Sequence, residues 1–573
     1  MSILRILLAC FGSATLYLLS KILYNIFLHP LRRYPGPLTH AAARIPYCAH
    51  LCAGRLPFHI HALHAQYGPI VRIAPDELSI SGAGSAWKDI MGHQHGAREL
   101  GKWWHFYAPV PRLADAHIVA APREEHARLR RAMAHGFSDA AMRAQEPLIA
   151  RYIDLLVRRL RENAVDAAGK MRPLDIMAWY NFTTFDVIGD LAFGEAFGCL
   201  EGSDYHPWVK AMFEMAKGGV VMQSASFFPG LTDLLLGLIP EKSKRAREEH
   251  QLLTRAKLER RIALGKDRPD LIEGLLKKKD EWGLGIEKLQ ANAGALIIAG
   301  SETTATLLSG VTYLLLKNPA ALEKLTEEVR STFKSEGEIS INSVGHLKYM
   351  LACLDEALRL YPPTPSGLPR VVPQGGTNIV GNFVPENTVV AIHMWATYHD
   401  ETNFTKPFEF HPERHLGDAR FAADRLEVLQ PFHVGPRSCL GRNQTANSFL
   451  LPSTYHLSTL QNNTVVYLDL EMSHHNRGAN HRSNIAHINP ADLNPVDHTQ
   501  ARLLLTDDQE YRQHHGLDDR MLAGNVTAPS GNLLRAYDLN TGSTPAAIPR
   551  RDQWMYAQHP SSSPPPGPPE LAA

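Results

Sequence analysis

One short loop, residues 431–442, combines a cysteine, an arginine and two glycines at close spacing. It reads Pro-Phe-His-Val-Gly-Pro-Arg-Ser-Cys-Leu-Gly-Arg. The thiolate of Cys439 is a group that iron accepts as a ligand, and Arg437 offers a permanent fork of donors to a carboxylate. Gly435 and Gly441 keep the backbone bare on both sides, so that a flat group can approach it. These residue types suit a haem held by an axial sulfur, with a propionate near the arginine.

A cysteine is more often a small buried hydrophobe than a ligand, so the neighbours of Cys439 carry this interpretation. The 29 histidines are scattered along the chain. We therefore expect neither a disulfide framework nor a structural metal site. No C-x-x-C pair and no zinc pattern occurs among the other cysteines, which are Cys10, Cys48, Cys52, Cys199 and Cys353.

A second group of chemical residues lies in the middle of a proline-free run, residues 286–317. The run predicts one helix of roughly 48 Å at 1.5 Å per residue. At its centre Gly300, Glu302 and Thr303 interrupt apolar sequence, although a glycine in a helix interior costs about 1 kcal/mol. They form either a polar stripe with a mild kink or a groove in which Thr303 donates a hydrogen bond and Glu302 relays protons.

Two further predicted helices carry charges at regular spacing. Residues 347–360 contain Glu356 and Arg359 three positions apart, a pair worth only about 0.2 to 0.5 kcal/mol on an exposed helix. A helix beginning after Pro122 places His126 and Arg130 on one face. That face is either a solvated basic surface or a binding site for an anion.

Together these stretches resemble the cytochrome P450 family. Residues 432–441 match its haem-binding signature F-x-x-G-x-R-x-C-x-G, and residues 299–304 match A-G-x-(D/E)-T-T. The E-x-x-R pair and a Pro-Glu-Arg-His segment at 412–415, similar to the family's P-E-R-F, precede the cysteine in the family's order. The resemblance extends to fungal microsomal members of secondary metabolism such as isotrichodermin C-15 hydroxylase.

The resemblance implies roles for individual residues. Cys439 would be the axial ligand of the haem iron, and Gly300, Glu302 and Thr303 the catalytic residues that bind oxygen and deliver protons. A buried network of Glu356, Arg359 and Arg414 would lock the cysteine loop. His126 and Arg130 match a W-x-x-x-R helix, with His in place of Trp. The cofactor would contact Arg437, Arg370, His126, Arg130, Phe432, Gly435 and Gly441.

The implied fold is mainly α (α+β), with a long central helix and small antiparallel sheets. A hairpin at residues 70–80 agrees with it, because two apolar runs flank the turn Ala74-Pro75-Asp76-Glu77.

The apolar residues from Val220 to Ile239 are expected to pack in the core, although this region roofs the substrate pocket in the family. Arg128 and Arg131 would face away from the haem, toward an acidic electron donor.

The chain begins with an apolar run, residues 3–28, interrupted by Arg5, Lys21 and Asn25. About 20 apolar residues span a bilayer as a helix, so the run is long enough if Lys21 reaches the interface. A cleaved signal peptide is the alternative, but no small-x-small cleavage site is evident. Arg32 and Arg33 would hold the following domain in the cytosol. We expect a single-pass anchor in the endoplasmic reticulum membrane.

Four regions follow from these patterns: a membrane anchor at residues 1–28, a proline-rich hinge at 29–55, a P450 haem domain at 56–443 and a divergent tail at 444–573. A long helix should follow Gly441, but Pro452 would end it early. The tail is polar and ends in a Ser/Pro-rich stretch, a composition typical of disorder. We attribute it to a shifted reading frame, a retained intron or a truncation.

The predicted function is that of a haem-thiolate monooxygenase. It would use heme b, O2 and an NADPH-cytochrome P450 reductase to hydroxylate or epoxidise a lipophilic, terpenoid or polyketide-like molecule. No flavin or nicotinamide fingerprint occurs in the chain, and a net charge of +1 gives no support for a nucleic-acid partner. The alternatives are a P450-type isomerase or dehydratase, or a protein that its unusual C-terminus leaves catalytically silent.

Overall fold

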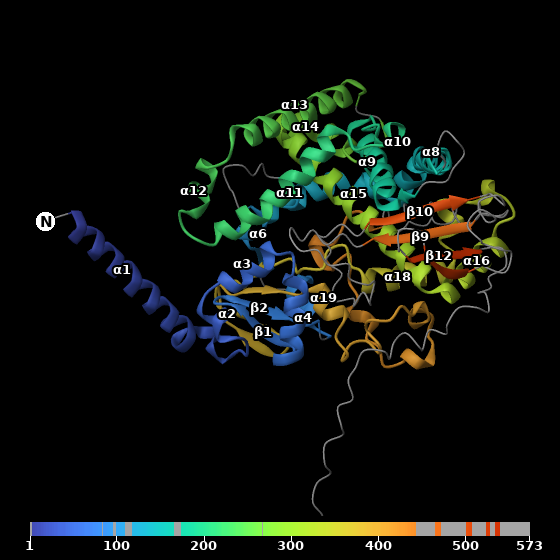
Figure 1. The fold of residues 1–573 in the computed structure, drawn as a ribbon. Helices are drawn as coiled ribbons and strands as arrows, with labels where there is room; N and C mark the ends of the chain where they lie inside the picture. Colours follow the sequence, from blue (N-terminus) through green and yellow to red (C-terminus); the bar gives the residue numbers. More distant parts are fainter. Residues whose placement is uncertain are drawn as a thin grey trace, which may run out of the picture.

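The computed structural model describes residues 3–82, 84–94, 99–108, 117–164, 173–265 and 268–442, together with four strands beyond them. Helices dominate these residues (Figure 1). The longer helices are α1 (Ile3–Leu23), α3 (Ile45–Cys52), α4 (Leu56–Tyr67), α7 (Arg123–Met133), α8 (Asp139–Asn163), α9 (Ile176–Phe193), α11 (Pro207–Ser226), α13 (Glu241–Ala263), α14 (Glu273–Trp282), α15 (Ile286–Lys317), α16 (Pro319–Thr332) and α18 (Lys348–Leu360).

Short helices connect them: α2 (Leu38–Ala42), α5 (Ala86–Met91), α6 (Trp104–Tyr107), α10 (Cys199–Gly202), α12 (Leu231–Gly237), α17 (Ile341–Val344) and α19 (Met394–Tyr398). The predictions of a helix at 286–317 and of a helix ending at Leu360 are confirmed. So is a helix that begins after Pro122, which is the N-cap of α7.

The long helix α15 runs through the core and packs along α9. Both helices are rich in apolar residues, so each buries side chains on more than one face. The Tyr180 and Thr312 hydroxyls hydrogen-bond between them at 3.0 Å. Gly300 lies against Ile188, where a Cβ would come within 2.7 Å of the Ile188 Cδ1 atom. The α9–α15 pair therefore sets the position of the acid and hydroxyls at the centre of α15.

A small sheet has the strand order β1-β2-β8-β5-β3. The predicted hairpin is confirmed, because β1 (Ile70–Ala74) pairs antiparallel with β2 (Glu77–Ile80). β2 is parallel to β8 (Val389–Ala391), whereas β8 with β5 (Arg370–Val371) and β5 with β3 (Gly101–Lys102) are antiparallel. In the last pair Lys102 lies opposite Arg370. A two-stranded ribbon joins β6 (Thr377–Ile379) and β7 (Asn382–Val384).

The N-terminal helix α1 projects from the rest of the molecule (Figure 1). The segment Leu7–Leu28 is long and apolar enough to cross a membrane, and none of its most apolar window is buried. Two donors of the following proline-rich stretch, Arg33 Nη2 and the Tyr34 hydroxyl, bond to the carbonyl of Phe383 at 2.6 and 2.8 Å. The Arg72 amide donates to the Pro35 carbonyl at 2.7 Å. The stretch is thus attached to the domain.

The expectation of core packing for Val220 to Ile239 is confirmed for Ala225, Phe227 and Phe228, which are buried or pack against a core cluster, and is wrong for α12. Val221, Leu234 and Leu238 are 49, 59 and 67% exposed, and α12 buries no residue. The helix α12 contacts α11, but its exposed leucines are not covered by any other described element. In the view of Figure 1, α12 lies on the side from which α1 projects.

Within the segment predicted to be largely disordered, the structure describes four strands: β9 (Val465–Glu471), β10 (Gln500–Thr506), β11 (Ala523–Thr527) and β12 (Leu533–Asp538). They form a sheet in the order β11-β12-β9-β10-β4, in which β10 pairs antiparallel with β4 (Leu174–Asp175). The helix expected after Gly441 and the remainder of the tail lie outside the described residues.

Candidate active site

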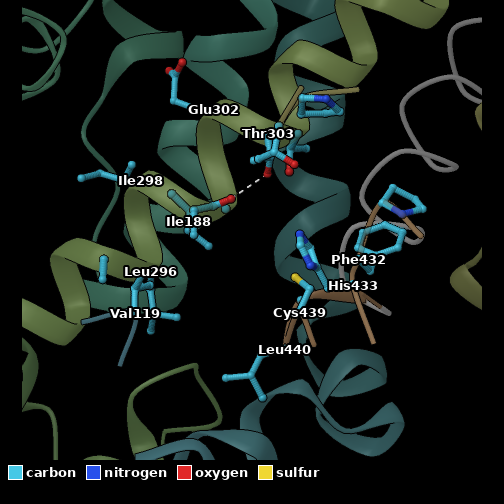
Figure 2. Close-up of a pocket in the computed structure, with 18 of the residues that line it drawn as sticks. Val119, Ile188, Leu296, Ile298, Glu302, Thr303, Phe432, His433, Cys439 and Leu440 are labelled. Carbon is cyan, nitrogen blue, oxygen red and sulfur yellow. Dashed lines mark hydrogen bonds between the residues drawn. The ribbon is translucent and has the colours of Figure 1, made fainter. Parts of the chain in front are cut away.

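A cavity of about 510 Å³ lies between α15, α9, α7 and the cysteine loop. Its wall is mostly apolar, and Figure 2 shows Ile188, Leu296 and Ile298 among the side chains around it. Most of the predicted site residues line this one cavity. They are His126, Arg130, Gly300, Glu302, Thr303, Arg370, Phe432, Arg437, Cys439 and Gly441.

The cysteine loop is held by its own backbone and by α7. The Cys439 amide donates to the Phe432 carbonyl at 2.8 Å, and Arg130 donates to the Ser438 carbonyl at 2.5 Å. Gly435 has a φ of +76°, and a Cβ there would collide with the backbone of Met91. Gly435 is therefore required by a close approach to α5, and it does not itself line the cavity.

The Cys439 side chain is exposed to the cavity (Figure 2). Desolvation by the surrounding protein raises the pKa of its thiol above the ordinary value, while the Gly441 amide and the Arg130 guanidinium lower it. A bound metal cation adds a much larger preference for the thiolate. The loop thus presents a single sulfur with two groups beside it that favour its charged form.

Cationic side chains gather at one end of the cavity. Lys102, Arg370 and Arg437 each line it, and their mutual repulsion contributes to the lowering of the pKa of Lys102 to about 7, after burial as the main cause. Burial, followed by Lys102 and the two arginines Arg437 and Arg130, lowers the pKa of His126 to about 4. One carboxylate, Glu99, pairs with Arg437. A bound group with negative charge would relieve the repulsion that remains.

Two groups at this end of the cavity also have buried polar atoms without a partner in the described part of the chain. They are the Nη1 atom of Arg437 and both ring nitrogens of His433. Buried donors of this kind are rare and call for a ligand. The accessible thiol, the excess of cations and these open donors fit an iron porphyrin with two carboxylates, so the residues present are suited to the predicted haem.

The acid and the hydroxyl of α15 point in different directions (Figure 2). Thr303 faces the cavity, and its hydroxyl donates to the Ala299 carbonyl at 2.6 Å. Glu302 points away from Cys439, and its buried Oε1 atom has no partner among the described residues. Desolvation raises the pKa of this carboxyl to about 7. Glu302 can therefore gain or lose a proton near neutral pH.

A buried ion network lies behind the cysteine loop. Glu356 accepts from Arg359 at 2.8 and 2.9 Å and from Arg414 at 3.0 and 3.1 Å, and all three side chains are 0% exposed. Arg359 also donates to the carbonyls of Tyr398 and Pro407 at 2.9 and 2.6 Å. The network thus joins α18 to the 3-10 helix Pro412–Leu416 and to the loop after α19.

Several neighbours of these residues were not predicted. His415 Nε2 contacts Glu356 at 3.1 Å, and its only signal in the sequence is the departure from P-E-R-F. Glu99 pairs with Arg437 across 338 residues of sequence, and Lys102 meets Arg370 through strand pairing. No local pattern marks these last two contacts, because they depend on tertiary structure.

Comparison with known proteins places these observations in a family. The cytochrome P450 family model matches residues 44–445. Cytochrome P450 monooxygenase tpeC of Talaromyces stipitatus is 49% identical over 431 residues, 74% of this chain and 83% of that protein. Trichothecene C-15 hydroxylase of Fusarium sporotrichioides is 44% identical over 437 residues, covering 75 and 87%. Averantin hydroxylase of Dothistroma septosporum is 45% identical over 442 residues, covering 77 and 82%.

Proposed function

The chain belongs to the cytochrome P450 monooxygenase family, and from this premise we propose that it inserts one oxygen atom of O2 into a lipophilic small molecule by hydroxylation or epoxidation. The observation that carries the proposal is one apolar cavity that contains both the Cys439 thiol and the Thr303 hydroxyl. Haem with a thiolate ligand supplies oxygen activation when it is bound.

Several residues of the chain would hold the haem. Cys439 would provide the axial sulfur to heme b, and Arg437, Arg370, Arg130 and His126 would hold its carboxylates. Burial and the neighbouring cations lower the pKa of His126 to about 4, and its ring offers an N–H donor. Phe432 and Gly441 would shape the loop around the sulfur.

Proton delivery would belong to α15. Glu302, which lines the cavity but points away from Cys439, has a pKa of about 7 and would collect a proton, while Thr303 would present a hydroxyl to the cavity. A carboxyl with this pKa supports oxygen activation, since monooxygenation consumes protons from solvent, whereas isomerisation and dehydration have no net proton uptake. Gly300 would allow α9 to approach α15 closely enough to keep both groups in place.

The substrate class rests on the relatives. Their names include a trichothecene and an averantin hydroxylase from fungi, and a terpenoid or polyketide-like secondary metabolite is the corresponding substrate proposed here. The cavity agrees in chemistry, because its wall is mainly aliphatic.

The proposed redox partner is a membrane-bound NADPH-cytochrome P450 reductase. Arg128 and Arg131 are exposed on α7, the helix that holds the cysteine loop through Arg130. They lie where an acidic donor could approach that loop. The apolar segment Leu7–Leu28 and the arginines after it support a single-pass anchor in the endoplasmic reticulum with a cytosolic haem domain. The region boundaries at residues 28, 55 and 443 are part of this proposal.

A catalytically silent protein is the second candidate. It is favoured by the end of the family match at residue 445, after which 128 residues of the 573-residue chain have no counterpart in the family model. The reduced, carbon monoxide-bound absorption spectrum of the full chain separates the two candidates. We expect a Soret band typical of thiolate ligation that is lost in Cys439→Ser. A chain that takes up no haem would overturn the proposed enzyme.

A further inference from the structure

The short turn at residues 117–121 forms part of the cavity wall. Ile118 and Val119 line the cavity, and Val119 is shown beside it in Figure 2. The amides of Ala120 and Ala121 donate to the His117 carbonyl at 3.0 and 2.8 Å. The turn is thus a single helical turn, which leaves its last carbonyls without partners inside the turn.

Lys102 satisfies these carbonyls. Its Nζ atom donates to the carbonyls of Ile118, Val119 and Ala121 at 3.2, 2.5 and 2.9 Å. An ammonium group has three N–H donors, so all of them are used on one turn. A cation at the carbonyl end of a helical turn is also electrostatically favourable.

The opposite side of the same turn is attached to α15. The Ile118 amide donates to the Asn292 Oδ1 atom at 2.9 Å, and the Asn292 amide group donates to the Lys288 carbonyl at 2.8 Å. Asn292 is buried. The turn is therefore fixed between β3, which carries Lys102, and α15, which carries the acid and the hydroxyl of the candidate site.

We propose that Lys102 is a positioning residue that holds the turn 117–121 against the cavity and thereby limits the size of the lipophilic molecule that binds there. This inference deepens the proposed function and rests on it for the identity of the cavity. Loss of the three hydrogen bonds would release the wall that carries Ile118 and Val119, while the turn keeps its attachment to Asn292.

The charges around Lys102 make this attachment depend on pH. Burial is the main cause that lowers its pKa to about 7, followed by Arg437 and Arg370, while Glu99 acts in the opposite direction. His126 also faces it. A neutral amine has two N–H donors instead of three and no charge, so the turn is held most firmly below pH 7. Carboxylates bound between these cations would raise the pKa of Lys102, so the turn would stay firmly held up to a higher pH.

The test compares Lys102→Met, Lys102→Arg and the control Lys88→Met, which alters an exposed lysine on α5. Amide hydrogen exchange of residues 117–121 is measured in the full chain, with haem content recorded. Binding of clotrimazole, a bulky azole, and of imidazole is measured by absorption. For Lys102→Met we expect exchange of the turn to rise about tenfold. Clotrimazole affinity should change several-fold more than imidazole affinity, with partial rescue in Lys102→Arg and no change in Lys88→Met.

Two results would overturn the proposal. In the first, exchange at 117–121 in Lys102→Met equals that of the unaltered chain. In the second, exchange rises equally around the whole cavity and the two azoles weaken in parallel, which would make Lys102 a general stabilising residue. The exchange result does not require a thiolate spectrum, so failure of the proposed enzyme and failure of this inference are distinguishable.

Discussion

Glu302 is a carboxylate whose environment differs from that of an ordinary surface carboxylate. It lies in the middle of α15 with an unpartnered buried oxygen, and desolvation alone raises its pKa to about 7. No cation in the described residues is a cause of the shift. The chain therefore keeps an uncompensated acid at the candidate site, at a cost in stability that suits a functional group.

The first prediction follows from this pKa. The folded chain keeps a proton on Glu302 between the ordinary value of 4.5 and about 7, whereas the unfolded chain does not. Folding stability should therefore fall as pH rises through this range. Glu302→Gln should match the unaltered chain near pH 4.5 and become more stable by up to about 3 kcal/mol above pH 7. Guanidinium unfolding at a series of pH values measures the difference.

Substitution of Glu302 should lower activity although it raises stability. If Glu302 delivers protons, turnover per haem falls as pH rises above about 7, and Glu302→Gln loses this limb together with about 10²-fold in rate. The matched control is Glu323→Gln on α16, for which we expect neither change. A stability difference that does not vary with pH would contradict the assigned environment of Glu302.

At the scale of elements, two contacts between helices and their neighbours position the site. Gly300 sets how closely α9 approaches α15, and Glu356 joins α18 to the segment that precedes the cysteine loop. The first is a contact between apolar surfaces, and the second is a set of fully buried charges. Substitutions at the first contact should therefore act through steric overlap, and substitutions at the second through the loss of a partner for buried charges.

The second prediction concerns the α9–α15 contact. Gly300→Ala should gain about 1 kcal/mol from helix propensity, but the new methyl group would meet the Cδ1 atom of Ile188 at 2.7 Å. We expect the single variant to be no more stable than the unaltered chain. Ile188→Val removes that Cδ1 atom and leaves the Cγ1 contact of 3.1 Å, so Gly300→Ala should be less unfavourable in this background than in the unaltered chain. A double-mutant cycle of thermal unfolding gives the coupling, and simple additivity would exclude the contact.

The third prediction concerns the buried network. Glu356→Ala leaves Arg359 buried without its carboxylate and leaves Arg414 with Asp424 alone, which should cost about 3 to 5 kcal/mol. We also expect loss of haem on purification. The exposed pair of Lys324 and Glu413 is the control, because Lys324→Ala should change stability by less than about 1 kcal/mol. Equal effects of the two substitutions would show that burial of the network carries no special cost.

At the scale of the whole molecule, α1 is joined to the rest of the described fold without a free linker. The side chain of Asn25 donates to the Ala42 carbonyl at 2.9 Å, and Leu31 is fully buried. Tyr34 bonds to the ribbon that contains Phe383. These contacts set how α1 leaves the domain. In the view of Figure 1, α12, which carries exposed leucines, lies on the side from which α1 projects.

The fourth prediction is that removal of residues 1–28 releases the protein from membranes. The full chain should remain in the membrane pellet after carbonate washing, since Leu7–Leu28 is long enough to span. A chain beginning at His29 should move largely to the soluble fraction while it keeps the thiolate absorption band. Substitution of Asn25 by Ala within the full chain is the control and should leave it membrane-bound. A full chain found in the soluble fraction would contradict the anchor.

The sequence alone determined the local elements and the identity of the chemical residues. A proline-free apolar run predicts the bounds of α15, and the signature around Cys439 names the family that the comparisons show. Such patterns are local, because helix periodicity and a ten-residue loop need no knowledge of distant contacts. The same reasoning failed for α12, since apolar composition does not say whether other elements cover a helix.

Only the tertiary structure decided which distant side chains share the site. Lys102 lies opposite Arg370 because β3 pairs with β5, and Glu99 meets Arg437 across 338 residues. The pKa of Glu302 depends on the protein packed around it and not on its neighbours in sequence. Charge pairing, desolvation and strand register depend on distances in space, and a sequence specifies these only once the chain has folded.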